Sequence, residues 1–266
     1  MICSFKIGKY ARSFANGNTL ITLFPHCSFW YGVIQTMILT IDTKSSPWME
    51  NLPYDWQDVA PLGQTILLKK HEIIFHQDEP AGHIYVVMSG RIRMFFTSPS
   101  GDEKTIAIVG KNGLLGESCL FDHPTYNHAV ITASKAALIK IPKERFREAW
   151  NQNTLLAHQA LRFIDLKNHV LISHSMQLSF YSATQRICYT LLQLGSTYGK
   201  VSDGKRVITV KFTHQELANV VGTSRVTVAN TMKELERQQF LSKENGMYVI
   251  EKESEWYSSV LVNMLL

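Results

Sequence analysis

Four neighbouring side chains, Arg225, Val226, Thr227 and Asn230, have the chemistry to recognise the bases of double-stranded DNA. An arginine binds guanine through two hydrogen bonds or contacts a phosphate, and an asparagine pairs with adenine. Val226 and the methyl group of Thr227 suit the C5-methyl group of thymine. No carboxylate lies among these residues to accept a hydrogen bond from cytosine. The set therefore predicts a binding site rich in A·T pairs.

These side chains need a helix whose first turn enters the major groove, and residues 213–235 predict a helix-turn-helix. Ala218 is small where two helices cross, Gly222 tolerates a left-handed turn, and Ser224 can cap the second helix. The inward face is apolar: Leu217, Val221, Val228, Met232 and Leu235. The expected DNA contacts are Thr213, Gln215, Ser224, Arg225, Val226, Thr227, Asn230 and Lys233.

The alternative interpretation is a pair of helices that pack together without binding DNA. Asn245-Gly246 follows the pair and separates two apolar runs, which predicts a β-hairpin with a two-residue turn. A helix-turn-helix followed by such a hairpin is a winged helix-turn-helix, and we favour this interpretation.

Residues 64–142 contain short apolar runs separated by turn residues, which predicts a β-sandwich or barrel such as a jelly roll. The expected fold class is α+β, with an N-terminal jelly-roll β-barrel, a long central dimerisation helix and a C-terminal winged helix-turn-helix. The expected boundaries are an N-terminal extension at 1–50, an effector-binding β-roll at 51–150, the central helix at 151–181 and the DNA-binding domain at 182–266.

Residues 153–180 contain neither glycine nor proline and can form one long helix. Leu156, Phe163 and Val170 recur every seven residues and Leu166 is offset by three, which is the spacing of a coiled-coil seam. An apolar stripe of this kind also occurs in domain cores. Between two domains, however, a second copy of the helix is the most economical cover, so these four residues are the expected interface of a homodimer.

Composition excludes several classes of protein. The 266 residues carry a net charge of +5 and a 45% hydrophobic share, which excludes a disordered chain and permits a nucleic-acid partner. The four cysteines (Cys3, Cys27, Cys119 and Cys188) lie far apart, so neither a zinc ribbon nor a clustered iron–sulfur site is expected. Scattered single cysteines fit a reducing cytoplasm. We expect no metal and no cofactor.

The apolar segment 19–41 has three interpretations. It has about the length of a membrane span, although Pro25, His26 and Gln35 interrupt it. Basic residues before it resemble those of a signal peptide, but no convincing cleavage site follows. The third interpretation, which we favour, is a poorly structured extension ahead of a start at Met37 or Met49. On this interpretation the protein has no membrane partner.

The layout resembles the CRP/FNR family of bacterial regulators over residues 64–252. The motifs that carry the resemblance are TxQELANxVGTSRxTV in 213–228, YVVMSGRIR in 85–93 and GLLGESCLFD in 113–122. The resemblance implies a transcription regulator without catalytic activity that binds DNA as a dimer. A small-molecule effector would bind between the β-roll and the central helix, and RNA polymerase is a further candidate partner.

The sequence departs from the members of this family that bind cyclic nucleotides. In those members the Gly-Glu of the phosphate-binding segment is followed by an Arg-Ser or Arg-Thr pair, whose arginine neutralises the cyclic phosphate. Gly116-Glu117 is present here, but Asn127-His128 replaces the pair. Because an uncompensated buried charge is costly, cyclic AMP is not the expected effector.

A closer resemblance, in 209–228 and around Lys167, is to halorespiration regulators of the CprK type, which bind chlorinated phenols and recognise an A/T-rich palindrome. In that subfamily a lysine of the central helix contacts the phenolate, and Lys167 matches its position. A partly buried ammonium group prefers a phenolate, although Lys167 can also extend from the helix to water. The expected effector-binding residues are Gly116, Glu117, Tyr126, Asn127, Phe163 and Lys167, with Tyr85, Phe95 and Phe121 as further aromatic candidates.

Three other functions remain open. A redox or haem sensor of the same family would use Cys119, Cys188 or a histidine among His83, His123 and His128. A cupin-type metalloenzyme would need several ligands converging from neighbouring strands, but the histidines of this region occur singly. A dimeric adaptor would bind a protein in place of DNA.

Overall fold

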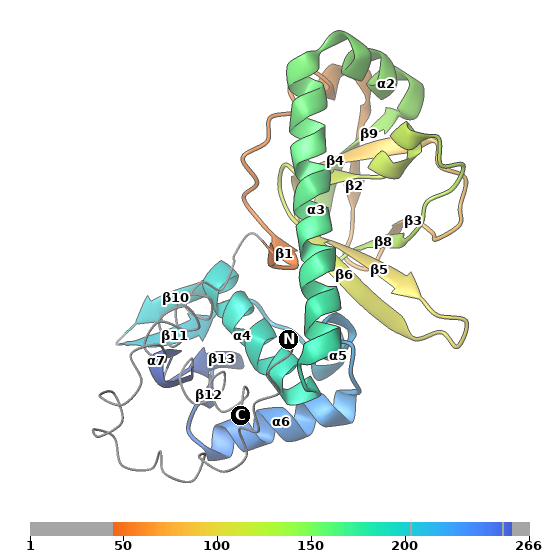
Figure 1. Ribbon diagram of the computed structural model, residues 1–266. Helices are drawn as coiled ribbons and strands as arrows, with labels where there is room; N and C mark the ends of the chain where they lie inside the picture. The colour runs from red at the N-terminus through yellow and green to blue at the C-terminus, as the bar shows by residue number, and fades with distance from the viewer. Residues whose placement is uncertain (1–44, 203, 252, 257–266) are drawn as a thin grey trace, which may run out of the picture.

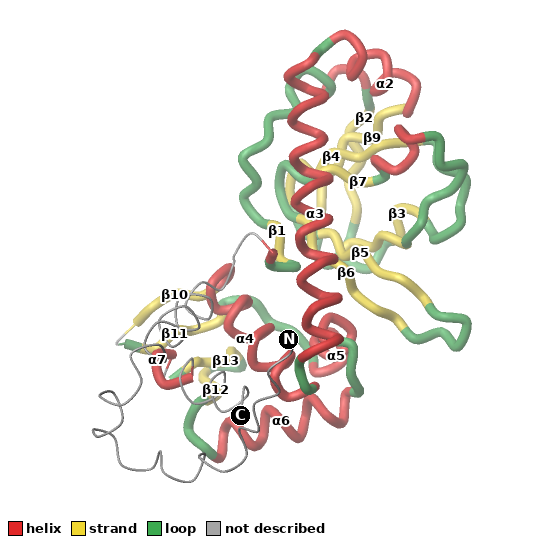
Figure 2. Tube along the Cα trace, viewed as in Figure 1, coloured by secondary structure: helices red, strands yellow, loops and turns green. Residues whose placement is uncertain are grey.

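The computed structural model describes residues 45–202, 204–251 and 253–256, which form a β-rich domain, a long helix and a C-terminal domain (Figures 1 and 2). The α+β class and the order of these parts confirm the predicted fold. Within the described residues no helix combines the length and apolar character needed to cross a membrane. The interpretations of segment 19–41 lie outside the described residues.

The β-rich domain contains two sheets, in the orders β1-β6-β5-β8-β3 and β2-β9-β4-β7. Its strands are β1 (Trp48–Met49), β2 (Gln64–Leu68), β3 (Ile73–Phe75), β4 (His83–Ser89), β5 (Ile92–Thr97), β6 (Glu103–Val109), β7 (Leu114–Leu115), β8 (Ala129–Thr132) and β9 (Ala136–Pro142). Two short 3-10 helices, η3 (Ala60–Leu62) and η4 (Glu117–Phe121), complete it. Strand β1 lies within the range expected to be an extension, so the β-rich domain also includes residues N-terminal to residue 51.

Helix α2 (Lys143–Gln152) leads into α3 (Thr154–Phe180). Helix α3 begins at Asn153, whose side chain accepts hydrogen bonds from the backbone N–H groups of Leu155 and Leu156 at 3.0 and 3.1 Å. It then runs along the β-rich domain and ends beside the C-terminal domain (Figure 1). The predicted single helix over 153–180 is therefore present.

The stripe expected to be the dimer interface instead packs within one chain. Leu156, Phe163 and Val170 are 4%, 0% and 0% exposed and belong to the core of the β-rich domain, against which Leu166 also packs. The ring of Tyr54 meets the ring of Phe163 edge-on at 5.5 Å. A helix lying on a domain also buries one face at near-heptad intervals, so the spacing alone does not distinguish the two kinds of packing.

A second apolar stripe of α3 remains open. Leu161, Leu171 and Leu178 are 46%, 45% and 49% exposed. Together with Ile164 and Asn168 they recur with heptad spacing along a face next to the buried one. The helix thus has an inner face covered by its own domain and an outer face suited to a second helix.

The C-terminal domain contains the predicted winged helix-turn-helix. Its helices are α4 (Ala183–Tyr198), α5 (His214–Val221), α6 (Arg225–Arg237) and the short α7 (Glu253–Trp256). Its sheet has the order β10-β11-β13-β12, with β10 (Gly199–Ser202), β11 (Lys205–Ile208), β12 (Leu241–Glu244) and β13 (Met247–Ile250). Asn245 and Gly246 have φ values of 50° and 78°, as a two-residue hairpin turn requires. Strand β10 was not expected from the sequence.

Candidate DNA-reading surface and ligand pocket

Helices α5 and α6 are joined at Gly222, whose φ of 73° lies in the left-handed region that favours glycine. Thr213 caps α5 because its hydroxyl accepts a hydrogen bond from the N–H group of Glu216 at 3.1 Å, and the Glu216 carboxylate accepts one from the Thr213 N–H group at 2.7 Å. Ser224 caps α6 by accepting from the N–H group of Thr227 at 3.0 Å. The turn at Gly222 and the Ser224 cap confirm the predicted geometry of the motif, whereas the cap at Thr213 was not expected from the sequence.

The base-reading residues predicted on α6 lie on one open surface. Val228, Met232 and Leu235 are buried in the core of the C-terminal domain, which leaves the opposite face of α6 uncovered. The exposed residues of that face are Arg225, Val226, Asn230 and Lys233, and Thr227 beside them is half-buried. Val226 is 68% exposed although it is apolar, as a contact to a thymine methyl group requires. Helix α6 lies at the end of the molecule remote from most of the β-rich domain (Figure 1).

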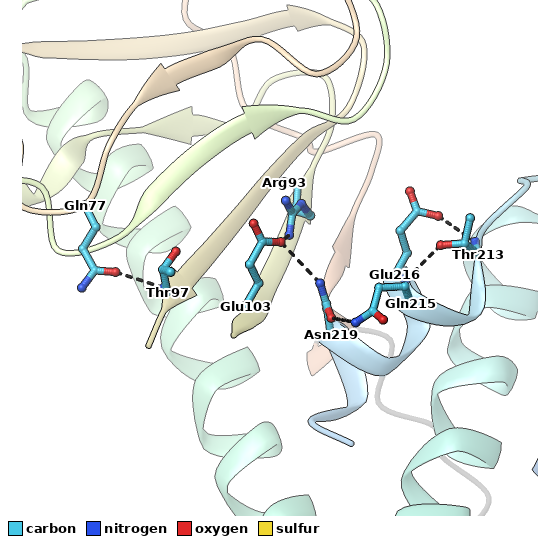
Figure 3. Close-up of polar contacts among 8 residues, drawn as sticks. All are labelled: Gln77, Arg93, Thr97, Glu103, Thr213, Gln215, Glu216 and Asn219. Atoms are coloured by element: carbon cyan, nitrogen blue, oxygen red, sulfur yellow. Dashed lines mark hydrogen bonds and ion pairs between the residues drawn. The ribbon is translucent and has the colours of Figure 1, made fainter. Parts of the chain in front are cut away.

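Thr213 and Gln215 occupy a different environment from the other predicted DNA contacts. Both line a groove between the two domains. The Gln215 amide donates a hydrogen bond to Asn219 Oδ1 at 2.7 Å, and Figure 3 shows the pair beside Arg93 and Glu103 of the β-rich domain. DNA contact by Thr213 or Gln215 stays a prediction.

A cavity of about 610 Å³ lies between the β-rich domain and α3. One wall is apolar and includes Met94, Phe96 and Ile106. The other wall is polar and brings together four residues from distant parts of the chain: Glu117, Asn127, His128 and Lys167. The pocket was expected at this place from the resemblance to effector-binding regulators.

Lys167 enters the pocket wall from α3 and is 8% exposed. Its ammonium group lies 2.7 Å from Glu117 Oε1, donates to the carbonyl oxygen of Leu114 at 3.0 Å and lies 4.9 Å from the ring centre of Phe163. Burial lowers the pKa of Lys167, and the Glu117 carboxylate opposes that shift. The side chain therefore does not extend to water, and its charge is already paired.

Three polar atoms of the pocket wall make no hydrogen bond within the protein: Glu117 Oε2, Ser118 Oγ and His128 Nε2. His128 Nδ1 lies 2.5 Å from Asn127 Oδ1, so Nδ1 carries the proton and Nε2 is left as an acceptor. Burial, and to a smaller extent the charge of Lys167, lowers the pKa of His128 to about 4. The polar wall thus presents two unpaired acceptors, Glu117 Oε2 and His128 Nε2, and the Ser118 hydroxyl, which can donate or accept, but no unpaired positive charge.

The structure brings some of the predicted effector residues together and separates others. Glu117, Asn127 and Lys167 line the cavity, and Gly116 precedes Glu117 with a φ of 79°. Phe163 packs behind Lys167 in the core. Tyr126 is not among the residues that line the cavity; it stacks on Phe75 at 3.9 Å and its hydroxyl bonds to the backbone of His83.

Phe96 and His128 line the pocket but were not expected to do so. Met94 and Phe96 share one face of β5 by the alternation of a strand, whereas Phe95, an aromatic candidate from the sequence, points to the other face. Tyr85 and Phe121, the other aromatic candidates, are not among the lining residues. The signal for Phe96 was present in the strand alternation, but which face covers the cavity depends on where α3 packs.

The features required by the alternative sensors are weak in the described part of the chain. Cys119 and Cys188 are buried, and burial raises the pKa of their thiols to about 11 and about 12, which keeps them protonated and unreactive. Within the described residues no three histidine, cysteine, aspartate or glutamate side chains are grouped as metal ligands would be. The geometry therefore favours neither thiol chemistry nor a cupin-type metal centre.

Comparison with known proteins identifies both domains. Residues 65–153 match the cyclic nucleotide-binding domain family, and residues 185–254 match the Crp-like helix-turn-helix domain family. The cyclic AMP receptor protein of Thermus thermophilus is 28% identical over 193 residues, which cover 72% of this chain and 86% of that protein. The chain belongs to the CRP/FNR family of transcriptional regulators. A CRP-like cAMP-activated global transcriptional regulator of Mycobacterium tuberculosis is 23% identical over 192 residues, 72% of this chain and 85% of that protein.

Solved structures of this family have the same fold. The c-di-GMP responsive global regulator CLP of Xanthomonas campestris superposes with a TM-score of 0.62 at 23% identity, covering 72% of this chain and 95% of that one. OCPA-complexed CprK superposes with a TM-score of 0.64 at 17% identity, covering 80% of this chain and 99% of that one. The chain is thus a DNA-binding transcription regulator with an effector-binding domain, and its relatives are regulators and not enzymes.

The buried His128 predicts a pH-dependent stability. Because the pKa of His128 falls to about 4 on folding, the folded state binds fewer protons than the unfolded state between pH 4 and 6.5. The contribution of the neutral His128 side chain to the free energy of unfolding is complete above pH 6.5 and is lost as the pH falls towards 4. We expect His128→Gln to reduce the loss of unfolding free energy over this range by about 3 kcal/mol, measured by urea denaturation. His158→Gln, at an exposed position of α3, is the control, and equal losses in wild type and His128→Gln would contradict the assignment.

Proposed function

We propose that this CRP/FNR regulator binds an A·T-rich palindrome as a homodimer under the control of a small aromatic effector that carries a hydroxyl group. The observation that supports it is the polar wall of the cavity, where Glu117 Oε2 and His128 Nε2 are unpaired acceptors. Buried acceptors are stabilised by a donor, and a phenol supplies one while its ring fits the wall of Met94, Phe96 and Ile106.

The same wall disfavours a cyclic nucleotide, although relatives of this chain are cAMP-activated by name. A cyclic phosphate is a permanent anion that can only accept hydrogen bonds. Lys167 is already paired with Glu117, and His128 is neutral at pH 7 because its pKa is lowered to about 4. Asn127 and His128 therefore offer no net positive charge where the cyclic-nucleotide-binding members have an arginine, and a buried phosphate would remain uncompensated.

Halogenated phenols fit this wall in both protonation states. The phenol hydroxyl can donate to Glu117 Oε2 or to His128 Nε2. Chlorine substituents lower the pKa of the phenol, and transfer of its proton to the Glu117 carboxylate would leave a phenolate beside the ammonium group of Lys167. Lys167 then keeps an anionic partner whichever group holds the proton. This argument supports the CprK-type effector class, which the structural likeness by itself does not establish.

The dimer interface that we propose is the outer stripe of α3: Leu161, Ile164, Asn168, Leu171 and Leu178. Its apolar members suit a two-stranded coiled coil, and a polar asparagine within such a seam selects register and strand number. Four of the five residues also line the effector cavity: Leu161, Ile164, Asn168 and Leu171. A second copy of α3 would therefore close the open side of the pocket and sense its contents.

In the dimer, two α6 helices would enter successive major grooves about one helical turn apart, which is why the operator should be a palindrome. The effector acts through its different affinities for the DNA-competent state and the other states of the dimer. We place this regulator in the cytoplasm, where its DNA is, with RNA polymerase as a further partner.

Selection of binding sites from random DNA tests the reading surface. We expect an A·T-rich palindrome, because Val226, Thr227 and Asn230 suit thymine and adenine. Arg225→Ala should weaken operator binding by about 10- to 100-fold, since a good base contact is worth about 1–3 kcal/mol. Arg145→Ala removes the same charge from exposed α2 and serves as the control. A G·C-rich consensus would contradict the proposed readout.

Thermal shifts with matched ligands test the pocket. We expect 2-chlorophenol to raise the melting temperature and 2-chloroanisole, which has the same ring but no hydroxyl donor, to have little effect. His128→Phe removes the acceptor and should reduce the shift by 2-chlorophenol. Stabilisation by cyclic AMP and not by phenols would overturn the effector assignment while leaving the DNA-binding function intact.

Sedimentation equilibrium tests the interface. Leu171→Glu places a charge in the outer stripe and should yield monomers at concentrations where the wild type is dimeric. Leu155→Glu makes the same change on α3 at a residue that is 80% exposed and lies off the stripe, and it should leave the dimer unchanged. Dissociation by both variants, or by neither, would contradict an interface at this stripe.

A further inference from the structure

We propose that residues 45–50 form a strap that positions the DNA-reading domain on the effector-binding domain, with Trp48 as its anchor. None of these residues belongs to the DNA-reading surface or to the polar wall of the effector pocket. The strap acts on the angle between the two domains, so it concerns how α6 is presented and not which bases it reads.

The strap joins two hydrophobic cores through two adjacent residues. Strand β1 pairs in parallel with β6, with Trp48 opposite Ile108 and Met49 opposite Val109. The N–H groups of Ile108 and Gly110 donate to the strap carbonyl oxygens of Pro47 and Met49 at 2.7 and 2.8 Å. Side chains alternate along a strand, so Met49 (3% exposed) enters the core of the β-rich domain while Trp48 (7% exposed) enters that of the C-terminal domain.

A polar contact reinforces the anchor. The hydroxyl of Tyr198, the last residue of α4, donates to Glu50 Oε1 at 2.6 Å. The guanidinium of Arg91 lies 5.7 Å from the centre of the Tyr198 ring. Burial raises the pKa of Glu50, and the hydrogen bond from Tyr198 together with the charge of Arg91 opposes that shift. The carboxylate is thus held by one residue of each domain.

The neighbouring strand makes a second connection to the helix-turn-helix. Lys104 of β6 donates to the carbonyl oxygen of Val220 near the C-terminal end of α5, where a cation satisfies an otherwise unpaired carbonyl group. Beside it, the Glu103 carboxylate accepts a hydrogen bond from Asn219 Nδ2 at 3.4 Å and forms an ion pair with Arg93 at 2.6 Å (Figure 3). Strand β6 therefore pairs with the strap and also contacts α5 through Lys104 and Glu103.

This arrangement fixes the direction of α6, because α5 and α6 pack into one hydrophobic core. It also places the joint on the strand that lines the effector cavity through Ile106 and Ala107. A displacement of β6 would shift Trp48 and α5 together. If the effector pocket is as proposed, the strap is one part of the chain through which its occupancy reaches the DNA-reading domain.

Distances between spin labels test the strap in the full chain. Labels on cysteines introduced at Ser100, in the turn after β5, and at Glu236, on α6, report on the two domains; Cys3 and Cys27 are replaced by serine, and the buried Cys119 and Cys188 stay unlabelled. With labelled chains diluted into unlabelled ones, so that the distances lie within one protomer, we expect a narrow distance distribution in the parent protein and a broad one in Trp48→Ala. Trp48→Phe, which keeps an aromatic ring in the C-terminal core, should restore the narrow distribution.

Trp56→Ala is the matched control, because Trp56 is 4% exposed and belongs to the core of the β-rich domain alone. It should lower the melting temperature yet leave the distribution narrow. Tyr198→Phe, which removes only the hydroxyl, should broaden it even if Trp48→Ala fails to fold. A distribution that stays narrow in Trp48→Ala or Tyr198→Phe, or broadens equally in Trp56→Ala, would overturn the proposal.

Operator binding provides a readout that a loss of stability alone does not change. With the strap released, each half-site should bind as before because α6 is intact. Binding to the palindrome should weaken about tenfold because the two α6 helices of the dimer are no longer held at a fixed separation. Equal weakening of half-site and palindrome binding would contradict a positioning role. Absence of DNA binding in the wild type would refute the proposed DNA-binding function. The spin-label distances would still test whether the strap holds the two domains together.

Discussion

The packing of α3 along the β-rich domain determines where the other functional surfaces lie. The helix buries Leu156, Phe163 and Val170 on its inner face and leaves Leu161, Leu171 and Leu178 on the outer one. Lys167 belongs to the inner face, which is why its ammonium group can be buried only with a carboxylate opposite. Removal of either member of a buried pair costs about 3–5 kcal/mol, so Glu117 is held in place by the helix and in turn fixes one wall of the pocket.

Strand β6 links the surfaces that this packing creates. Its middle lines the cavity, its N-terminal end holds α5 through Lys104, and its C-terminal end pairs with β1. A ligand in the cavity therefore lies on the same strand as the contacts that hold the DNA-reading domain. This proximity gives a physical basis for communication within one chain, alongside any communication through paired α3 helices.

The sequence predicted the elements well because their signals are local. The cap at Ser224, the left-handed glycine at Gly222 and the Asn245-Gly246 turn each depend on residues within one or two turns of chain. The faces of α3 were harder to assign. Two apolar stripes coexist on it, and the heptad spacing of Leu156, Phe163 and Val170 does not reveal whether a sheet or a second helix covers them.

Long-range contacts account for what sequence reasoning missed at the pocket. His128 and Phe96 line a cavity that exists only because α3 forms its other side, and the pairing of Lys167 with Glu117 joins residues fifty positions apart. Trp48 and Met49 lay in a segment expected to be an extension, since a two-residue strand has too little periodicity to be recognised.

The strap has one further consequence, which concerns insertions and deletions. Trp48 and Met49 are consecutive yet occupy different hydrophobic cores. Adding or removing a single residue on the N-terminal side of Trp48 changes little in the pairing of β1 with β6. Adding or removing a residue between Met49 and Glu50, whose carboxylate is held by Tyr198, would shift β1 by one position. Trp48 and Met49 would then exchange the cores that they face, because a slip of one residue reverses every side chain of a strand. Evolution of this joint is thus constrained in spacing more tightly than in composition, and alignments of related chains should show substitutions here far more often than gaps.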